Sequence, residues 1–107
     1  MADVAALIRE GILATEEVNR AIPPRTLARR KSRGEPLTIE ESDRIARLVR
    51  VVAYAARVFD DPELRSAWLR SGNPALGGER PIDLAVTDIG ARRVETALNR
   101  IAWGDYS

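Results

Sequence analysis

The 107-residue sequence contains neither cysteine nor histidine. Their absence excludes disulfide bonds, thiolate and imidazole metal ligands, cysteine nucleophiles and catalytic triads built on histidine. A metal would have oxygen ligands only, and the acidic residues lack the spacing of a calcium-binding loop. We therefore predict no metal site and no cofactor, and we expect a binding protein and not an enzyme.

Long hydrophobic runs are also missing. The apolar run Val51–Ala56 is far too short to span a bilayer. No basic region precedes an apolar stretch near the first residue, so we expect no signal peptide. The sequence predicts a soluble, cytoplasmic protein without membrane contact.

Negative charge is absent from residues 20–34, which carry six positive side chains. The net charge is +3 over residues 1–34 and −2 over residues 35–107, which sum to the overall charge of +1. The positive charge is therefore concentrated in a local basic patch. Such a patch on a nearly neutral chain indicates a specific anionic partner. Sixteen of the 17 basic residues are arginine, a count that codon bias alone would also give.

The first third of the chain predicts three short helices, over residues 4–10, from a cap at Thr15 to Pro23, and over residues 24–33. This is the outline of a helix-turn-helix unit, whose third helix carries the positive charges. We predict that this helix contacts DNA, the alternative being a solvated arginine face. The predicted DNA-binding residues are Arg25, Thr26, Arg29, Arg30, Lys31 and Arg33.

A capping box of Thr38 and Glu41 predicts the start of a long helix over residues 39–59. Its apolar residues follow alternating spacings of three and four, which is typical of a coiled-coil seam. Two further apolar rows lie beside this seam, so the helix needs covering on two sides, and we predict a homodimer. The predicted dimer contacts are Ile45, Leu48, Val52, Ala55 and Phe59.

The second half also predicts helices and turns. Asp61 caps a helix that Pro62 opens and that ends near Arg70, with Leu64, Ala67 and Trp68 facing inward. Residues 71–78 have the composition of a loop, residues 81–86 form one or two helical turns, and Thr87 or Asp88 caps a last helix ending at Trp103. The predicted fold is all-α: a helix-turn-helix-like unit over residues 1–37, joined by a long amphipathic helix to a small helical domain within residues 38–107.

Two features that resemble catalytic motifs have structural explanations. The acidic pairs at residues 40–41 and 60–61 lie at helix starts, where carboxylates complement the helix dipole. Gly77-Gly78 lacks the residues of a phosphate-binding loop, so we interpret it as a turn.

The second half resembles the toxin-binding domain of the Xre/MbcA/ParS antitoxins, and the first half resembles that family's Xre-type helix-turn-helix. The matching segments in the second half are Ala56-Arg57-Val58-Phe59-Asp60-Asp61, Ala67-Trp68-Leu69-Arg70, Asn73-Pro74-Ala75-Leu76-Gly77-Gly78, Pro81-Ile82-Asp83-Leu84, Gly90-Ala91 through Arg100-Ile101, and Gly104. In the first half they are Pro24-Arg25-Thr26-Leu27-Ala28-Arg29-Arg30 and Glu41-Ser42-Asp43-Arg44. Arg80 stands where the family usually has a small hydroxyl residue, so we expect a weak cap there.

The resemblance implies an antitoxin that blocks a RES-domain, NAD-consuming toxin in a hetero-oligomer and represses its own operon by binding operator DNA. It implies toxin contacts through Trp68, Leu69, Asn73, Leu76, Gly77, Gly104, Asp105, Tyr106 and Ser107. The acidic, aromatic tail of residues 105–107 resembles parts of an NAD-like substrate. The main alternative is a stand-alone dimeric transcriptional regulator, and a more remote one is an enzyme that uses only carboxylates and arginines.

Overall fold

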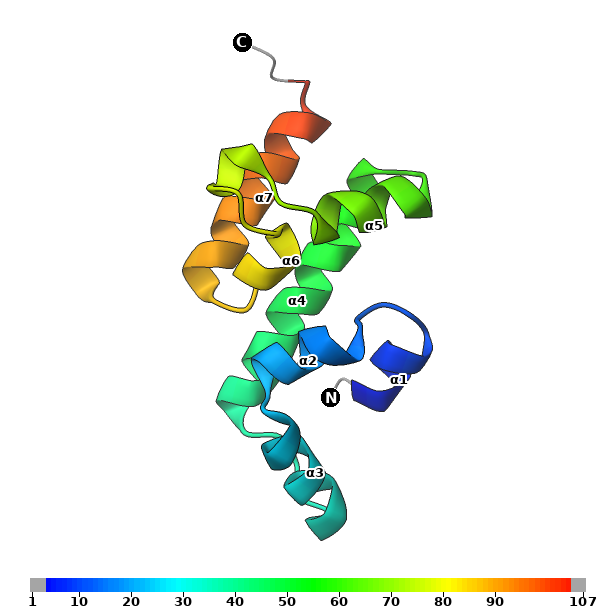
Figure 1. Cartoon of the computed structure of the whole chain (residues 1–107), viewed down its shortest axis with the longest axis vertical. Helices are drawn as coiled ribbons and strands as arrows, with labels where there is room; N and C mark the ends of the chain where they lie inside the picture. Colours follow the sequence, from blue (N-terminus) through cyan, green and yellow to red (C-terminus); the bar gives the residue numbers. More distant parts are fainter. Residues whose placement is uncertain (1–3, 105–107) are drawn as a thin grey trace.

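The structure, a computed structural model, describes residues 4–104. Within this range the chain contains helices and no β-strand, which confirms the predicted all-α fold. The elements are α1 (Val4–Arg9), α2 (Thr15–Ala21), α3 (Pro24–Arg33), α4 (Ile39–Val58), α5 (Pro62–Arg70), the 3-10 helix η1 (Pro74–Leu76), α6 (Pro81–Leu84) and α7 (Asp88–Ala102). The arrangement is elongated, with α3 at one end and the last turn of α7 at the other (Figure 1). Among the described residues, no helix is long and apolar enough to cross a membrane.

Three helices begin at the caps that the sequence predicts. The Thr38 hydroxyl accepts a hydrogen bond from the Glu41 amide at 3.1 Å, and the Glu41 carboxylate accepts one from the Thr38 amide at 2.9 Å. Asp61 and Thr87 cap α5 and α7 with their side chains. These bonds satisfy amides that have no partner within the helix, so the chain's own local sequence fixes where α4, α5 and α7 start.

The start of α6 has no side-chain cap. Arg80 instead donates two hydrogen bonds of 2.9 Å to the Asp83 carboxylate one turn later. This hydrogen bonding to Asp83 raises the pKa of Arg80. Close packing joins α6 to α7: a Cβ atom on Gly90 would lie 1.9 Å from the Leu84 carbonyl oxygen. Only glycine therefore fits at this contact between the two helices.

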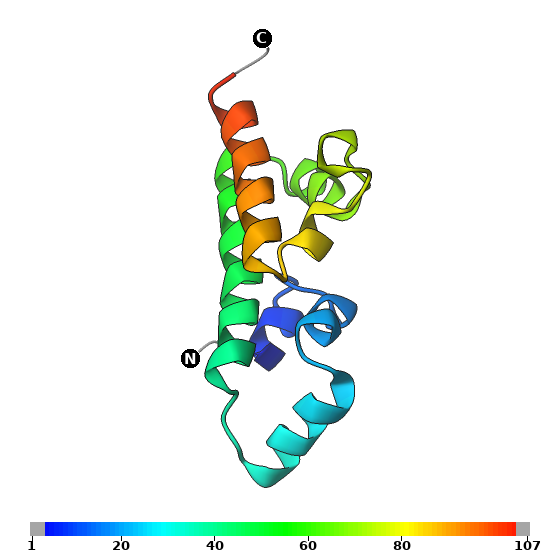
Figure 2. The ribbon, with the colours of Figure 1, turned by 90° about the vertical axis from the view of Figure 1, so that its left-hand side faces the viewer.

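The other helices pack around α4. Helices α2, α5, α6 and α7 all contact it, and α7 lies along much of its length (Figure 2). Five residues of α4 are buried: Glu41, Ile45, Leu48, Val51 and Ala55. Three of them belong to the predicted seam, but Val51 is buried where the seam predicted Val52, which is half-buried. With Leu7 and Leu13 near the start of the chain and Val94 and Leu98 in α7, the apolar members of this row belong to one continuous core. This core includes residues from both sides of the predicted domain boundary between residues 37 and 38. The boundary itself stays a prediction.

The predicted dimer contacts face the chain's own core. Ile45, Leu48 and Ala55 are buried by the other helices, and Val52 and Phe59 are partly buried against the same core. For Ile45, Leu48 and Ala55 this corrects the assignment to a contact between two chains, because other helices of the same chain, among them α7, α5 and α2, cover α4. The inward face predicted for α5 is also wrong in part: Leu64 and Ala67 are exposed, and Leu69 is the buried residue.

A buried ion pair joins the two halves of the chain. The Glu17 side chain is 1% exposed and accepts hydrogen bonds from Nε and Nη2 of Arg70 at 2.6 and 2.9 Å. Glu17 also accepts the Ala14 amide at 2.8 Å, so Ala14 is the N-cap residue of α2 and the predicted cap at Thr15 is wrong. Arg70 completes the junction by donating to the Ile12 carbonyl at 3.4 Å. A bidentate charge-assisted pair of this kind fixes the position of α2 against α5.

Replacing Arg70 with methionine should destabilise the fold by about 3–5 kcal/mol, because the Glu17 charge would stay buried without its counter-ion. Urea unfolding at pH 7 measures the change. Arg92→Met is the matched control: it removes an exposed pair with Asp88 and should cost less than about 1 kcal/mol. The double variant Glu17→Gln/Arg70→Met should recover part of the loss. Equal stability of the Arg70 and Arg92 variants would contradict a structural role for the buried pair.

Candidate functional site

The predicted DNA-binding residues lie on α3, at the end of the molecule away from the last turn of α7 (Figure 2). None of the residues of α3 is buried, and Leu27 is its half-buried contact with the core. Arg25, Arg29 and Arg33 are exposed at spacings of four residues, which places them on one helix face. Lys31 is exposed and Thr26 half-buried. The exposed side of α3 therefore presents a row of three guanidinium groups to solvent.

Arg30 differs from its basic neighbours because it binds α4. Its Nε and Nη2 atoms donate to the two carboxylate oxygens of Glu41 at 2.6 and 3.0 Å, and Glu35 lies 3.8 Å from Nη1. The hydrogen bond from Arg30, followed by that from the Thr38 backbone, lowers the pKa of Glu41. The guanidinium of Arg30 therefore holds α3 against α4, and this position does not favour the predicted contact with DNA.

Four of the residues that the family resemblance assigns to toxin contact shape the region between α5 and α6. Leu69 and Leu76 are buried in the core. Asn73 accepts the Ala75 amide at 2.9 Å and so caps η1, and Gly77 ends η1 with a φ of 70°, a conformation that favours glycine. Leu69 and Leu76 therefore offer little surface to a partner, whereas Asn73 and Gly77 shape the loop around η1. Trp68 is partly buried and packs against Phe59, with ring centroids 5.8 Å apart.

The end of α7 carries a large exposed aromatic side chain. Trp103 is 83% exposed. It borders a shallow pocket of about 200 Å³ together with Tyr54, Arg57, Val58 and Ala102. The Arg57 guanidinium lies 5.5 Å from the centroid of the Tyr54 ring, so a cation–π contact fixes one wall of this pocket. Tryptophan, tyrosine and arginine are the residues that most often dominate protein–protein binding energy. Gly104 follows with a φ of 63°, and Asp105, Tyr106 and Ser107 lie outside the described residues.

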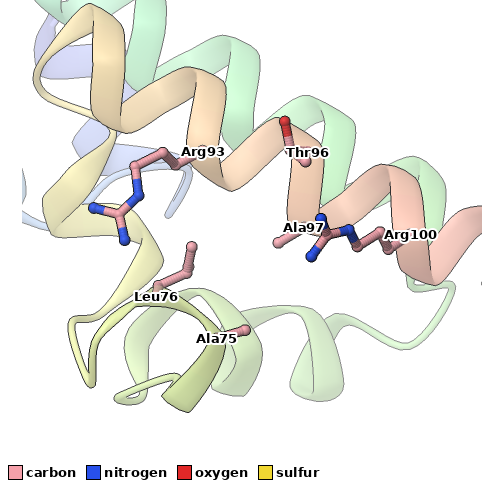
Figure 3. Close-up of a pocket in the computed structure, with 6 residues that line it drawn as sticks. All are labelled: Ala75, Leu76, Arg93, Thr96, Ala97 and Arg100. Carbon is pink, nitrogen blue, oxygen red and sulfur yellow. The ribbon is translucent and has the colours of Figure 1, made fainter. Parts of the chain in front are cut away.

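A second pocket, of about 190 Å³, lies between α7 and η1. It is lined by Ala75, Leu76, Arg93, Thr96, Ala97 and Arg100. Figure 3 shows the side chains of Arg93 and Arg100 leaving α7 on either side of Leu76. Neither arginine is among the site residues that the sequence predicts. An indication exists in the sequence, because neither arginine has an acidic residue three or four positions away, whereas Arg92 has Asp88.

The described residues 4–104 contain no group of three or more acidic side chains placed to hold a metal ion. The arrangement instead offers an exposed basic helix at one end and two shallow pockets beside α7 toward the other.

Comparison with known proteins finds a family match in the C-terminal half of the chain and relatives that align over most of it. The family described as the antitoxin Xre/MbcA/ParS C-terminal toxin-binding domain matches residues 55–104, which run from the last turn of α4 through α7. An antitoxin Xre of Pseudomonas putida is 36% identical over 98 aligned positions, covering 92% of this chain and 62% of that protein. Residues 55–104 thus match the toxin-binding domain of the Xre/MbcA/ParS antitoxins, and most of the chain is similar to an antitoxin Xre.

Further relatives are similar to the chain over comparable lengths. A Prs ADP-ribosylating antitoxin of Sphingobium is 35% identical over 91 positions, covering 77% of this chain and 57% of that protein. An antitoxin Xre of Yersinia enterocolitica is 36% identical over 87 positions, covering 80% of this chain and 59% of that protein. The chain thus spans about three-fifths of the length of these relatives, and the resemblance to the Xre/MbcA/ParS family that its own motifs predict is confirmed.

Acid should weaken the α3–α4 junction. Because the folded state lowers the pKa of Glu41, that residue stabilises the fold above its ordinary pKa of about 4.3, and the contribution is lost as the pH falls through the lower folded value. We expect Glu41→Gln to be less stable than the unchanged chain at pH 7 and the difference to shrink by about pH 3. Urea unfolding at both pH values measures it, with the more exposed Glu40→Gln as control. A difference independent of pH would contradict this account.

Proposed function

We propose that the chain is an antitoxin that binds and neutralises a RES-domain, NAD-consuming toxin. The observation that carries the proposal is the family match over residues 55–104, the segment that folds as α5, η1, α6 and α7 against α4. The alignment to an antitoxin Xre extends over 92% of the chain, so the support is not confined to this segment. Neutralisation by binding needs no catalytic group of the antitoxin's own.

Trp103 and the pocket beside it supply the contact with the toxin in this proposal. A large aromatic ring with 83% of its surface exposed is a costly feature for an isolated chain and a typical anchor in a complex. Trp68 belongs to the same half but packs on Phe59, so its role is to hold α5 in place. Insertion of residues 105–107 into the toxin's NAD pocket remains a prediction from the sequence.

A second activity in the proposal is repression of the chain's own operon through α3. The exposed guanidinium groups of Arg25, Arg29 and Arg33 share a face, and such a row suits the phosphates and base edges of DNA. Homodimerisation would pair two such helices on one operator, but the contact cannot use the buried row of α4.

Co-expression tests the antitoxin proposal. The unchanged chain should restore growth of cells that produce the toxin encoded by the adjacent gene, and the purified pair should form a complex. Trp103→Ala should weaken the complex by roughly 30-fold, as expected for the loss of a 2 kcal/mol aromatic anchor. Ile39→Ala, at an apolar residue of similar exposure on the first turn of α4, is the control and should bind normally. Full activity of the toxin in the presence of the unchanged chain would contradict the proposal.

A salt titration tests the DNA proposal. The unchanged chain, alone and with its toxin, should bind a duplex containing the promoter of its own gene, with an affinity that falls steeply as salt rises. Arg29→Gln/Arg33→Gln should reduce the slope of log affinity against log salt by about two, one for each phosphate contact. Arg93→Gln/Arg100→Gln removes the same charge from α7 and should leave the slope unchanged. Equal slopes for all three proteins would contradict DNA contact through α3.

A further inference from the structure

Arg93 and Arg100 are exceptional among the arginines of the C-terminal half. Between residues 38 and 104, all of which the structure describes, the other eight arginines each make an ion pair, a hydrogen bond or a cation–π contact: Arg44, Arg47, Arg50, Arg57, Arg65, Arg70, Arg80 and Arg92. Arg93 and Arg100 make none with the described part of the chain, and both are exposed. Two guanidinium groups thus remain available to an external acceptor.

The pocket between them offers hydrogen-bond donors and an apolar floor. Leu76, Ala75 and Ala97 form the apolar lining, and Figure 3 shows the Leu76 side chain between the two arginines. The Thr96 hydroxyl already donates to the Arg92 carbonyl at 2.9 Å. The polar groups free to bind a ligand are therefore cationic donors, which select carboxylate or phosphate oxygens.

Spacing and size favour a protein segment as the occupant. Arg93 and Arg100 are seven positions apart, which is about 10 Å along α7, and this span matches two acidic side chains seven positions apart on a partner helix. A volume of about 190 Å³ is below the range of about 300–1,000 Å³ typical of nucleotide-sized ligands. A nucleic acid is disfavoured by the net charge of −2 over residues 35–107 and by the apolar floor.

We propose that Arg93 and Arg100 bind two acidic side chains of the toxin, which flank an apolar residue seated against Leu76 and the two alanines. This inference rests on the proposed antitoxin function, and it adds a second contact to the one at Trp103. The pocket between Arg93 and Arg100 is lined by α7 and η1, whereas the pocket beside Trp103 is lined by α4 and the end of α7.

The test compares two double variants that remove the same charge from different places. Arg93→Gln/Arg100→Gln should bind the purified toxin of the adjacent gene at least tenfold more weakly than the unchanged chain, with a shallower dependence on salt. Arg29→Gln/Arg33→Gln should bind the toxin as tightly as the unchanged chain. Because none of these four side chains has an ion pair within the described residues, both variants should unfold at the same temperature as the unchanged chain.

Each outcome separates this inference from the function on which it rests. Unaltered toxin binding by Arg93→Gln/Arg100→Gln would overturn the inference and leave the antitoxin proposal standing. Equal weakening by both double variants would show a general effect of charge and would also overturn it. Loss of promoter binding, and not of toxin binding, would assign the pair to DNA. Failure of the unchanged chain to bind the toxin would overturn the antitoxin proposal itself.

Discussion

The burial of α4 on several sides is the constraint from which the rest of the structure follows. Its apolar rows are too wide for one neighbouring helix, and α7, α5, α6 and α2 together provide the cover. Since α2 comes from the first third of the chain and α7 from the last, both halves contribute to one core. The buried pair of Glu17 and Arg70 strengthens this junction where it is polar. A second copy of the chain therefore has to use a surface other than the main apolar row of α4.

Some arginines join two elements of the fold, whereas others are exposed and available to bind a partner. Arg30, Arg47 and Arg70 each tie one element to another, through Glu41, the Val86 carbonyl and Glu17. The exposed guanidinium groups of α3 and the pair on α7 have no such partner within the described residues, and they lie at separate places along the elongated molecule (Figure 1). Long-range attraction between exposed charges is screened within about 10 Å at ordinary salt, so two such sites can bind different partners without strong interference.

The sequence predicts those features that depend on a few neighbouring residues. Thr38 with Glu41, and Asp61 before Pro62, identify helix starts because cap and amide lie within one turn. Periodicity identifies which apolar residues of α4 share a helix face, but it does not say whether the same chain or a second chain covers that face. This is why the dimer assignment failed for Ile45, Leu48 and Ala55, which the same chain buries. The pairing of Glu17 with Arg70 spans 53 positions, which local rules do not reach.

In the candidate site, residues that shape the fold are easier to predict from the sequence than residues available to a partner. The residues that carry the family resemblance, such as Leu69, Asn73 and Leu76, are recognisable because a buried leucine or a capping asparagine is required to build the turn around η1. Residues that only contact a partner are not required for the fold, so the residue type at these positions can differ with the partner. Trp103, Arg93 and Arg100 have this freedom, since each is exposed and none supports the core. Under the proposed function, specificity for a toxin is therefore to be sought on the exposed side of α7 and not in the motif that carries the family resemblance.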